Sequence, residues 1–420
     1  MTPNLEVTAG NDARGSSVDS AGRRMKILFL THRLPYAPNR GDRIRAFHLL
    51  REMSRFADVS LCSLTHDDDE RSYRDRVPFA TDVTCLPVRR LRNLARAAAR
   101  VPTSRPLTHS LLDAAGIHAA LRDLIDRRPP DLVVAFCSGM ARFMFEPPLE
   151  GRPFVLDMVD VDSVKWDQLA KVSRGPLRWI YRREARTLRA FEVAAVSRAG
   201  ATLVVNERER IALEKIAPAA RITVVPAGVE IDAFRPPGPP SSEPVVIFCG
   251  VLNYPPNEIG VRWFATDVWP RVRSAVPDAK FKVIGAAPTN AVRNLASSDA
   301  SIDVVGTVPS VQPYLWSAAV SVAPIHVSQG IQTKVLEALA AGLPVVVTPS
   351  VSLGLPPAVQ RTCPTADAPG PFADAVIALL RRSPEDRRQL AAAAAPDSLT
   401  WDQQLRDLEP ILRSAARSHL

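Results

Sequence analysis

The sequence lacks the features that mark membrane-spanning, secreted and disulfide-rich proteins. It has no run of about 18 consecutive apolar residues, the length that a membrane-spanning helix needs. Residues 1–24 contain no apolar core segment, so no secretory signal is expected, and we interpret them as a disordered leader. The five cysteines are scattered without a CxxC pair. These absences favour a cytoplasmic protein with reduced thiols, and they exclude a cysteine-based metal site.

Aromatic residues are also scarce, at 6% of the chain, and they do not interleave with the basic stretches. A nucleic-acid partner is therefore not expected, because single strands are bound by aromatic side chains placed among basic ones. The net charge of +9 nevertheless indicates an anionic partner. What the chain does have is length and apolar content. Its 420 residues, 46% of them hydrophobic, exceed what one core holds and predict two domains.

Short apolar runs recur along both halves of the chain, such as "KILFLTH", "LVVAFC" and "FVLDMV" before residue 235 and "VVIFCG", "KFKVIG" and "PVVVTP" after residue 244. Runs that are continuously apolar predict parallel strands covered by helices on both faces. We predict an N-terminal domain at 25–235, a Pro-rich linker at 236–244, a C-terminal domain at 245–400 and a final helix at 401–420. That helix either extends the second domain or returns to the first.

One stretch, "SQGIQTKVLEALAAGLPVVVTP" from Ser328, joins a glycine, a helical pattern and a strand. The spacing predicts a helix of about eleven residues between Gly330 and Gly342. Its amino end suits a diphosphate, to which Lys334 would add a charge, while Glu337 could accept hydrogen bonds from ribose hydroxyls. The alternative is a surface ion pair between Lys334 and Glu337, worth about 0.5 kcal/mol or less.

This stretch and the segment "LPYAPNRGDRIRAFHLL" resemble the retaining GT-B glycosyltransferases of family 4. They look closest to sugar transferases of exopolysaccharide loci that accompany exosortase sorting systems. The resemblance covers nearly all of 25–412. It implies an α/β GT-B fold, with two Rossmann-like doubly wound domains facing a central cleft. The C-terminal domain would bind a UDP- or GDP-sugar and the N-terminal domain a lipid-linked saccharide acceptor. Neither a cofactor nor a metal is expected.

The resemblance also implies a donor site. Glu337 would hold the ribose, Lys334 and the backbone around Gly330 the diphosphate, and Gly306 and Thr307 the base, although 306–307 reads equally well as a surface loop. The full set is Gly250, Gly306, Thr307, Gln329, Gly330, Ile331, Gln332, Lys334 and Glu337. The chain departs from the family twice. Gln329 replaces a glutamate, and the cations that usually follow the first strand of the C-terminal domain are missing from "CGVLNYPPNEIG", so Lys334 would substitute for them.

On the acceptor side, the loop after the first strand supplies Arg40, Gly41, Asp42 and Arg43, with Arg45 as a further positive charge. His32 lies at the end of that strand. Asp160 and Asp162 would orient acceptor hydroxyls, or Asp162 would cap the following helix. A metal shared by this D-x-D pair is the alternative. The candidate catalytic residues are thus Glu337, Lys334, His32 and Asp160. We interpret "HDDDE" at 66–70 as a solvated loop.

Two stretches, 89–105 and 171–189, combine arginines with leucine or tryptophan. Basic helices with apolar anchors suit an anionic membrane surface, so we expect peripheral attachment to the inner face of the plasma membrane. A solvated basic helix explains the pattern equally well. Two other functions remain open at this stage: a GT-B sugar-nucleotide 2-epimerase, which uses the same donor site without an acceptor, and a non-catalytic nucleotide-sugar-binding protein.

Overall fold

The structure is a computed structural model that describes residues 23–38, 41–394 and 396–417. Their contacts form two compact units. Residues 23–226 and 404–417 make the N-terminal unit, and residues 227–403 make the C-terminal unit. The division falls before the boundary predicted at residue 235, because Val229 bridges to Thr400 and Gly228 packs against Trp401. The predicted leader falls outside the described residues except for its last two positions.

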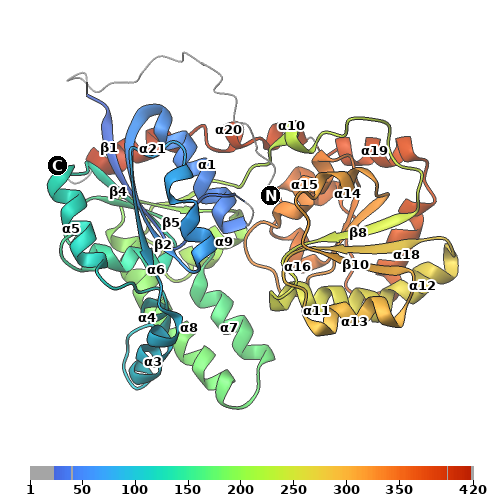
Figure 1. The fold of residues 1–420 in the computed structure, drawn as a ribbon, viewed down its shortest axis with the longest axis horizontal. Helices are drawn as coiled ribbons and strands as arrows, with labels where there is room; N and C mark the ends of the chain where they lie inside the picture. Colours follow the sequence, from blue (N-terminus) through green and yellow to red (C-terminus); the bar gives the residue numbers. More distant parts are fainter. Residues whose placement is uncertain (1–22, 39–40, 395, 418–420) are drawn as a thin grey trace. The chain divides into compact units, whose positions relative to one another are not determined.

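A seven-stranded parallel sheet forms the centre of the N-terminal unit, in the order β3-β2-β1-β4-β5-β6-β7 (Figure 1). Strands β2 and β4 lie on either side of β1. The chain therefore adds strands in one direction from β1 to β3 and in the other direction from β4 to β7. The strands are β1 (Met25–Thr31), β2 (Ala57–Thr65), β3 (Asp82–Pro87), β4 (Leu132–Phe136), β5 (Phe154–Val159), β6 (Ala201–Val204) and β7 (Ile222–Val224).

Helices cover both faces of this sheet, as the continuously apolar strands predict. The last helix of the chain lies here too, against α1 and strands β4 to β6, so it returns to the first unit. The helices are α1 (Gly41–Phe56), α2 (Asp68–Ser72), α3 (Arg90–Arg100), α4 (Leu107–Leu111), α5 (Ile117–Arg127), α6 (Ser138–Ala141), α7 (Asp162–Val172), α8 (Gly175–Arg198), α9 (Glu207–Glu214) and α21 (Leu408–Arg417).

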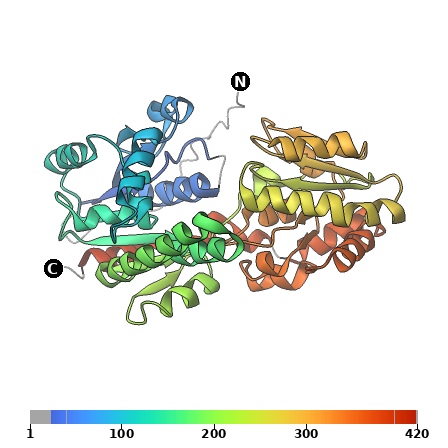
Figure 2. The same cartoon turned by 90° about the horizontal axis from the view of Figure 1, so that it is seen from below.

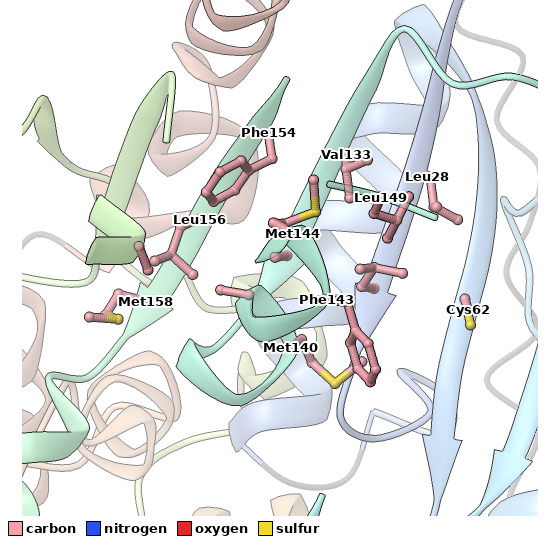
Figure 3. Packing of buried hydrophobic residues seen from close by; sticks show 14 of the residues in the cluster. Leu28, Cys62, Val133, Met140, Phe143, Met144, Leu149, Phe154, Leu156 and Met158 are labelled. Carbon is pink, nitrogen blue, oxygen red and sulfur yellow. The ribbon is translucent and has the colours of Figure 1, made fainter. Parts of the chain in front are cut away.

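The core on one face of this sheet is built from alternate residues of the strands. Phe154, Leu156 and Met158 project from the same side of β5, as Figure 3 shows, and pack with Met140 and Phe143 from the segment after β4. Successive side chains of a strand point to opposite faces of the sheet, so a strand with one buried face would alternate between apolar and polar residues. Both faces are buried, so every position of the strand is apolar except where a polar group finds a partner.

The C-terminal unit repeats the arrangement with five parallel strands in the order β10-β9-β8-β11-β12. Its strands are β8 (Val245–Cys249), β9 (Lys280–Ile284), β10 (Ile302–Gly306), β11 (Val320–Ala323) and β12 (Val345–Val347). The helices are α10 (Ile231–Phe234), α11 (Pro255–Trp263), α12 (Trp269–Ala275), α13 (Asn290–Ser298), α14 (Gln312–Trp316), α15 (Thr333–Ala340), α16 (Pro349–Ser352), α17 (Pro357–Thr362), α18 (Pro369–Leu380), α19 (Pro384–Ala392) and α20 (Trp401–Gln404).

Strand β8 shows how the two faces of this sheet are filled. Val246 and Phe248 join a core with residues of α11, α12 and α18, while Val245 and Ile247 join a second core with residues of α15. Figure 2 shows helices on both sides of this sheet. The two units therefore share one doubly wound topology, as predicted. Among the described residues, no helix is long and apolar enough to span a membrane, and all five cysteines are free thiols.

Candidate functional site

The C-terminal unit has a topological switch point between β8 and β11. From β8 the chain continues outward to β9 and β10, whereas β11 pairs on its other side and leads to β12. In doubly wound sheets, ligands bind at the carboxyl ends of the strands at such a point. The segment 324–332, which joins β11 to α15, and the segment after β8 both begin there.

Three neighbouring strands of this sheet reach glycine at their carboxyl ends. Gly250 follows β8, Gly285 follows β9, and Gly306 ends β10. The backbone N–H of Gly250 donates to Ile284 O (3.0 Å), and that of Gly285 donates to Gly306 O (2.8 Å). A Cβ on Gly285 would lie 1.7 Å from Gly250 O, so only glycine allows this close approach. Glycine at this position therefore lets the ends of β8 and β9 pack closely together.

Helix α15 begins at Thr333, later than the sequence predicts, and has eight residues instead of about eleven. The difference lies in the preceding turn, where Gly330 has a φ of 62° and Gln332 is still extended. Hydrogen bonds hold this turn. Ser328 N donates to Ser350 Oγ (2.9 Å), and Gln332 Nε2 donates to Ser328 Oγ (3.0 Å). The turn therefore has a fixed shape close to the amino end of the helix.

Lys334, in the first turn of α15, reaches the end of β8. Its Nζ donates to Asn257 Oδ1 (2.9 Å) and lies 4.5 Å from the ring centroid of the buried Phe248. A Cβ on Gly250 would lie 2.7 Å from that Nζ, so the ammonium occupies the space that the glycine leaves. Burial lowers the pKa of Lys334 to about 8. The cation expected after β8 is thus supplied from α15.

Glu337 lies one turn further along α15. Its carboxylate has no hydrogen-bond or ion-pair partner in the described part of the chain, and Lys334 pairs with Asn257 rather than with it. The alternative of a surface ion pair between the two is therefore wrong. Burial raises the pKa of Glu337 to about 7, an effect that the charge of Lys334 opposes. An acceptor group without a partner, at a switch point, is available to ligand hydroxyls.

The other predicted donor-site residues fall into two groups. Gly250, Gly330, Ile331 and Gln332 lie near Lys334, in the segments that follow β8 and β11, and Gln329 is partly buried in the same turn. Gly306 and Thr307 lie at the end of the edge strand β10, with β9 between them and β8. Gly306 is buried, whereas Thr307 is exposed.

The predicted acceptor-side residues belong to the N-terminal unit. His32 follows β1, and its Nε2 lies 3.4 Å from Asp42 Oδ2 at the start of α1. Gly41 begins that helix, is exposed, and has nothing within 4 Å of the place where a Cβ would be. Arg40 lies outside the described residues.

Two arginines predicted to face a ligand are instead buried in ion pairs. Arg43 lies 3.1 Å from Glu70, and Arg45 lies 2.9 Å from Asp157. The prediction that they offer charge to an acceptor is wrong, because these carboxylates already occupy them. Burial raises the pKa of Asp157, although Arg45 opposes the effect.

The stretch "HDDDE" is not a solvated loop as predicted. Asp67 caps α2 by accepting from Glu70 N (2.7 Å), and Glu70 is fully buried. The Glu70 carboxylate accepts from Leu34 N and His66 N at 3.1 and 2.6 Å. The acidic run therefore ends in a structural carboxylate that supports the segment after β1.

Asp160 and Asp162 follow β5. Asp162 is the first residue of α7 and makes no capping hydrogen bond of its own, so the capping prediction is wrong, and it accepts from Ser138 Oγ (2.6 Å). Asp160 Oδ1 has no partner in the described residues, and burial, with Glu209 adding to it, raises the pKa of Asp160 to about 7. Such a carboxyl can accept or donate a proton at neutral pH. The described residues contain no cluster of three or more metal ligands.

Sequence reasoning missed two residues of the C-terminal unit's site. Asn257 was visible only as part of "YPPNEIG", with nothing to link it to Lys334. Gly285 was detectable, because "VVIFCG", "KFKVIG" and "IDVVG" all end in glycine.

Comparisons with known proteins bear on the fold and on the class of the C-terminal unit. Residues 243–382 match the family model of group 1 glycosyl transferases. The whole chain resembles solved structures, although no curated protein matches the sequence. Sucrose-phosphate synthase of Thermosynechococcus elongatus is 16% identical, with a TM-score of 0.69 over 93% of this chain and 98% of that one. HepE of Anabaena, solved with UDP and glucose, is 14% identical, with a TM-score of 0.64 over 93% and 100%.

WaaG, a glycosyltransferase of lipopolysaccharide biosynthesis, is 15% identical, with a TM-score of 0.58 over 94% of this chain and 98% of that chain. Identities this low establish the fold alone. The chain therefore has the two-domain α/β fold of GT-B glycosyltransferases, and the group 1 family match within its C-terminal unit supports glycosyl transfer.

Proposed function

We propose that the protein is a retaining, metal-independent glycosyltransferase of family 4 that transfers a hexose from a UDP- or GDP-sugar to a lipid-linked saccharide in exopolysaccharide biosynthesis. The observation that carries this proposal is the pair Lys334 and Glu337 at the switch point of a unit that matches the group 1 family. Lys334 is a cation held by Asn257, and Glu337 is a carboxylate that has no partner among the described residues. The structures of HepE with UDP and with UDP-glucose support a nucleotide sugar as the donor.

In this mechanism Lys334 and the backbone around Gly330 hold the diphosphate, and Glu337 accepts from the ribose hydroxyls. As the bond from the sugar to the diphosphate breaks, negative charge develops on the leaving phosphate. Lys334 stabilises that charge, which is the largest catalytic contribution we assign to this unit. The ammonium is already placed by Asn257 and Phe248, so little reorganisation is needed.

The acceptor side of the proposal uses the polar side chains that the N-terminal unit leaves near strand ends. His32 and Asp42 follow β1, and Asp160 and Asp162 follow β5. Asp160, whose pKa lies near 7, is the candidate to take the proton from the attacking hydroxyl. Asp42 and Asp162 would orient the neighbouring hydroxyls.

We also propose that this unit attaches to an anionic membrane surface. Leu91 and Leu94 on α3, and Leu177 and Trp179 on α8, are exposed at 84%, 46%, 54% and 57%. Arg183 joins the two helices by donating from α8 to the carbonyls of Arg100 and Val101 at the end of α3. The same two stretches of the chain also carry exposed arginines: Arg89, Arg90, Arg92, Arg174, Arg178, Arg182, Arg186 and Arg189. Apolar anchors among cations fit an anionic lipid surface.

Donor binding tests the central claim. In a thermal-shift panel of UDP- and GDP-sugars, the true donor should raise the melting temperature of the wild type by mass action. Glu337→Ala should weaken its binding about 10- to 100-fold, the loss expected for hydrogen bonds to a charged group. The matched control is Glu385→Ala, an exposed glutamate of α19. Unchanged donor affinity in Glu337→Ala would remove the proposal.

Turnover then separates the possible activities. Incubation with the donor and native membranes should glycosylate a lipid-linked acceptor. Conversion of the donor sugar without membranes would identify a 2-epimerase instead. Donor binding without any turnover would identify a regulatory binding protein.

Vesicle co-sedimentation tests the membrane surface. We expect binding to phosphatidylglycerol vesicles that is lost in neutral phosphatidylcholine and weakened several-fold in Leu177→Ala/Trp179→Ala. Leu353→Ala, an exposed leucine of the C-terminal unit, is the control. Equal binding to both kinds of vesicle would contradict an electrostatic contribution.

A further inference from the structure

The segment that follows β5 in the N-terminal unit begins with a bulge. The register of β5 against β6 shifts between Asp157 and Val159. Val159 has a φ of 61°, a left-handed conformation that is a genuine outlier for a β-branched residue. The carboxylate of Asp157, which Arg45 holds, accepts a hydrogen bond from Val159 N (3.1 Å). Bulges beside binding sites redirect the side chain that follows, which here is Asp160.

Two further buried carboxylates hold the rest of segment 159–163. Val161 N donates to Glu209 Oε2 of α9 (2.9 Å), and Ser163 N donates to Glu192 Oε1 of α8 (3.0 Å). Glu209 and Glu192 are 1% and 0% exposed. Every second backbone N–H of the segment is therefore donated to a carboxylate, and the three carboxylates come from β5, α9 and α8. Hydrogen bonds to ionised acceptors are among the strongest in proteins, so the backbone of this segment is firmly held.

The two aspartates of the segment lie on either side of Val161. The Val161 side chain is buried in the core beside the sheet, and its backbone is extended, with a φ of −80° and a ψ of 95°. Neighbours of an extended residue point to the opposite side. We therefore place the side chains of Asp160 and Asp162 on the side of the segment away from Val161. Ser138, which follows the end of β4, donates to Asp162 Oδ2 (2.6 Å) and fixes that carboxylate.

This part of the unit also holds buried polar atoms that the protein does not use. Asp160 Oδ1, Ser163 Oγ and Glu192 Oε2 are buried and have no hydrogen-bond partner in the described part of the chain. Buried polar atoms are almost always hydrogen-bonded. Two of these three atoms are carboxyl oxygens, which accept hydrogen bonds from hydroxyl groups. They point to a ligand that brings hydroxyl donors, as a saccharide does.

We propose that Glu209 and Glu192 are positioning residues of the acceptor side, which hold segment 159–163 so that Asp160 and Asp162 meet the hydroxyl groups of the saccharide. This inference rests on the proposed function, in which Asp160 takes a proton from the attacking hydroxyl. In that step the hydroxyl oxygen bonds to the donor sugar's anomeric carbon. The bond from this carbon to the diphosphate breaks, its electron pair leaves with the phosphate, and the hydroxyl proton moves to Asp160.

Glu209 has an electrostatic effect on Asp160 as well. Burial raises the pKa of Asp160 to about 7, and the charge of Glu209 adds to this effect. The other charged groups that face Asp160 are Lys165 and Asp162 of α7 and Arg208 of α9; Asp162 raises the pKa, and the two cations lower it. Asp160 is mostly ionised, and able to take a proton, only above that pH. Removing the charge of Glu209 should therefore extend activity to lower pH.

The pH profile of turnover tests the role of Glu209. Glycosyl transfer to native membranes is measured from pH 5.5 to 8.5 at saturating donor. Glu209→Gln keeps an oxygen for Val161 N but loses the charge, so the acidic limit of turnover should move down by about half a pH unit or more. The KM for the donor should not change, because the proposed donor contacts lie in the C-terminal unit. The control is Glu207→Gln, an exposed glutamate of the same helix. An unchanged acidic limit in a folded Glu209→Gln would overturn the proposal.

Two variants of Glu192 test the hold on the backbone. Glu192→Ala removes the acceptor of Ser163 N, and it should lower kcat about tenfold and speed amide exchange in segment 159–163 about tenfold. Glu192→Gln keeps an acceptor oxygen, so it should restore most of both. Hydrogen exchange followed by mass spectrometry measures the segment without any substrate, and circular dichroism checks folding. If Glu192→Ala does not fold, Glu192→Gln and Glu209→Gln decide the matter.

The outcomes separate this inference from the proposed function. Absence of turnover in a wild type whose segment exchanges slowly would refute the proposed function. Faster exchange in Glu192→Ala with unchanged turnover would make Glu192 structural and overturn its positioning role. Unchanged exchange in a folded Glu192→Ala would show that the carboxylate does not hold the segment at all.

Discussion

The two units share one sheet topology but treat charged side chains differently at the carboxyl edge of the sheet. In the N-terminal unit, Glu70 and Asp157 are fully buried and each is paired with an arginine. In the C-terminal unit, Glu337 is partly exposed and has no ion-pair partner in the part of the chain that the structure describes. A charge that is buried for the fold needs a partner in the protein, whereas a charge that serves a ligand must be left available. The same edge is therefore partly structural in one unit and open for binding in the other.

Changes at the paired charges of the N-terminal unit should lower the free energy of unfolding, whereas changes at the unpaired charge of the C-terminal unit should weaken ligand binding. Removing a paired, buried charge leaves its partner desolvated and unpaired, which is strongly destabilising. Removing an unpaired, half-buried charge takes away a desolvation cost, so it should lower the affinity for the ligand without lowering the stability of the fold. The predictions that follow test this distinction, beginning with the largest effect.

Asp157→Ala should destabilise the N-terminal unit by about 3–5 kcal/mol, the cost of leaving one member of a buried ion pair alone. Arg45 would then keep its hydrogen bond to Val225 O (2.9 Å) but lose its three contacts to the carboxylate. Urea unfolding followed by circular dichroism measures the change. The matched control is Asp58→Ala, whose half-exposed pair with Arg24 should contribute about 1 kcal/mol or less. Similar losses in the two variants would show that burial does not distinguish these pairs.

Lys334→Met should weaken donor binding about tenfold, because it removes the cation placed at Gly250 while keeping the length of the side chain. The free energy of unfolding should change by about 1 kcal/mol or less, since Lys334 has a hydrogen bond to Asn257 but no ion pair with any described residue. Calorimetry with a UDP- or GDP-sugar measures the affinity, and Lys280→Ala on the exposed start of β9 is the control. A loss of several kcal/mol of stability without a loss of affinity would make Lys334 structural.

The fold could be predicted from the sequence because it depends on local patterns. Continuous apolar runs such as "VVIFCG" became strands buried on both faces, and the two-domain α/β prediction is confirmed. The position of Lys334 and Glu337 on one short helix followed from their spacing. The length of that helix did not, because the hydrogen bonds of Ser328 with Ser350 and Gln332 hold the turn before it.

What the sequence could not show were partners that lie far apart along the chain. Asn257 binds Lys334 across 77 positions, and Arg45 meets Asp157 across 112. Glu70 looked like one acid among several, and only the N–H groups of Leu34 and His66 show why it is buried. No local spacing encodes such pairs, since they depend on the order of strands in the sheet. The roles assigned to the site residues therefore stay predictions.

The smallest predicted effect is the pH dependence of donor binding. Glu337, with a pKa of about 7, becomes neutral as the pH falls, and it then accepts hydrogen bonds less strongly. Lys334, with a pKa of about 8, becomes neutral as the pH rises, and its attraction for phosphate is lost. Affinity for a UDP- or GDP-sugar should therefore be highest between about pH 7 and 8 and fall about fivefold by pH 6, where most of a carboxyl with that pKa is protonated.

The two sides of this profile can be assigned separately by calorimetry across pH 6 to 9.5. Glu337→Gln should bind more weakly at neutral pH and lose the acidic decline, because its amide does not titrate. Lys334→Met should lose the alkaline decline for the same reason. If Asp157→Asn instead removed either decline, the charges of the N-terminal unit would govern donor binding, and the division between structural and ligand-binding charges would fail.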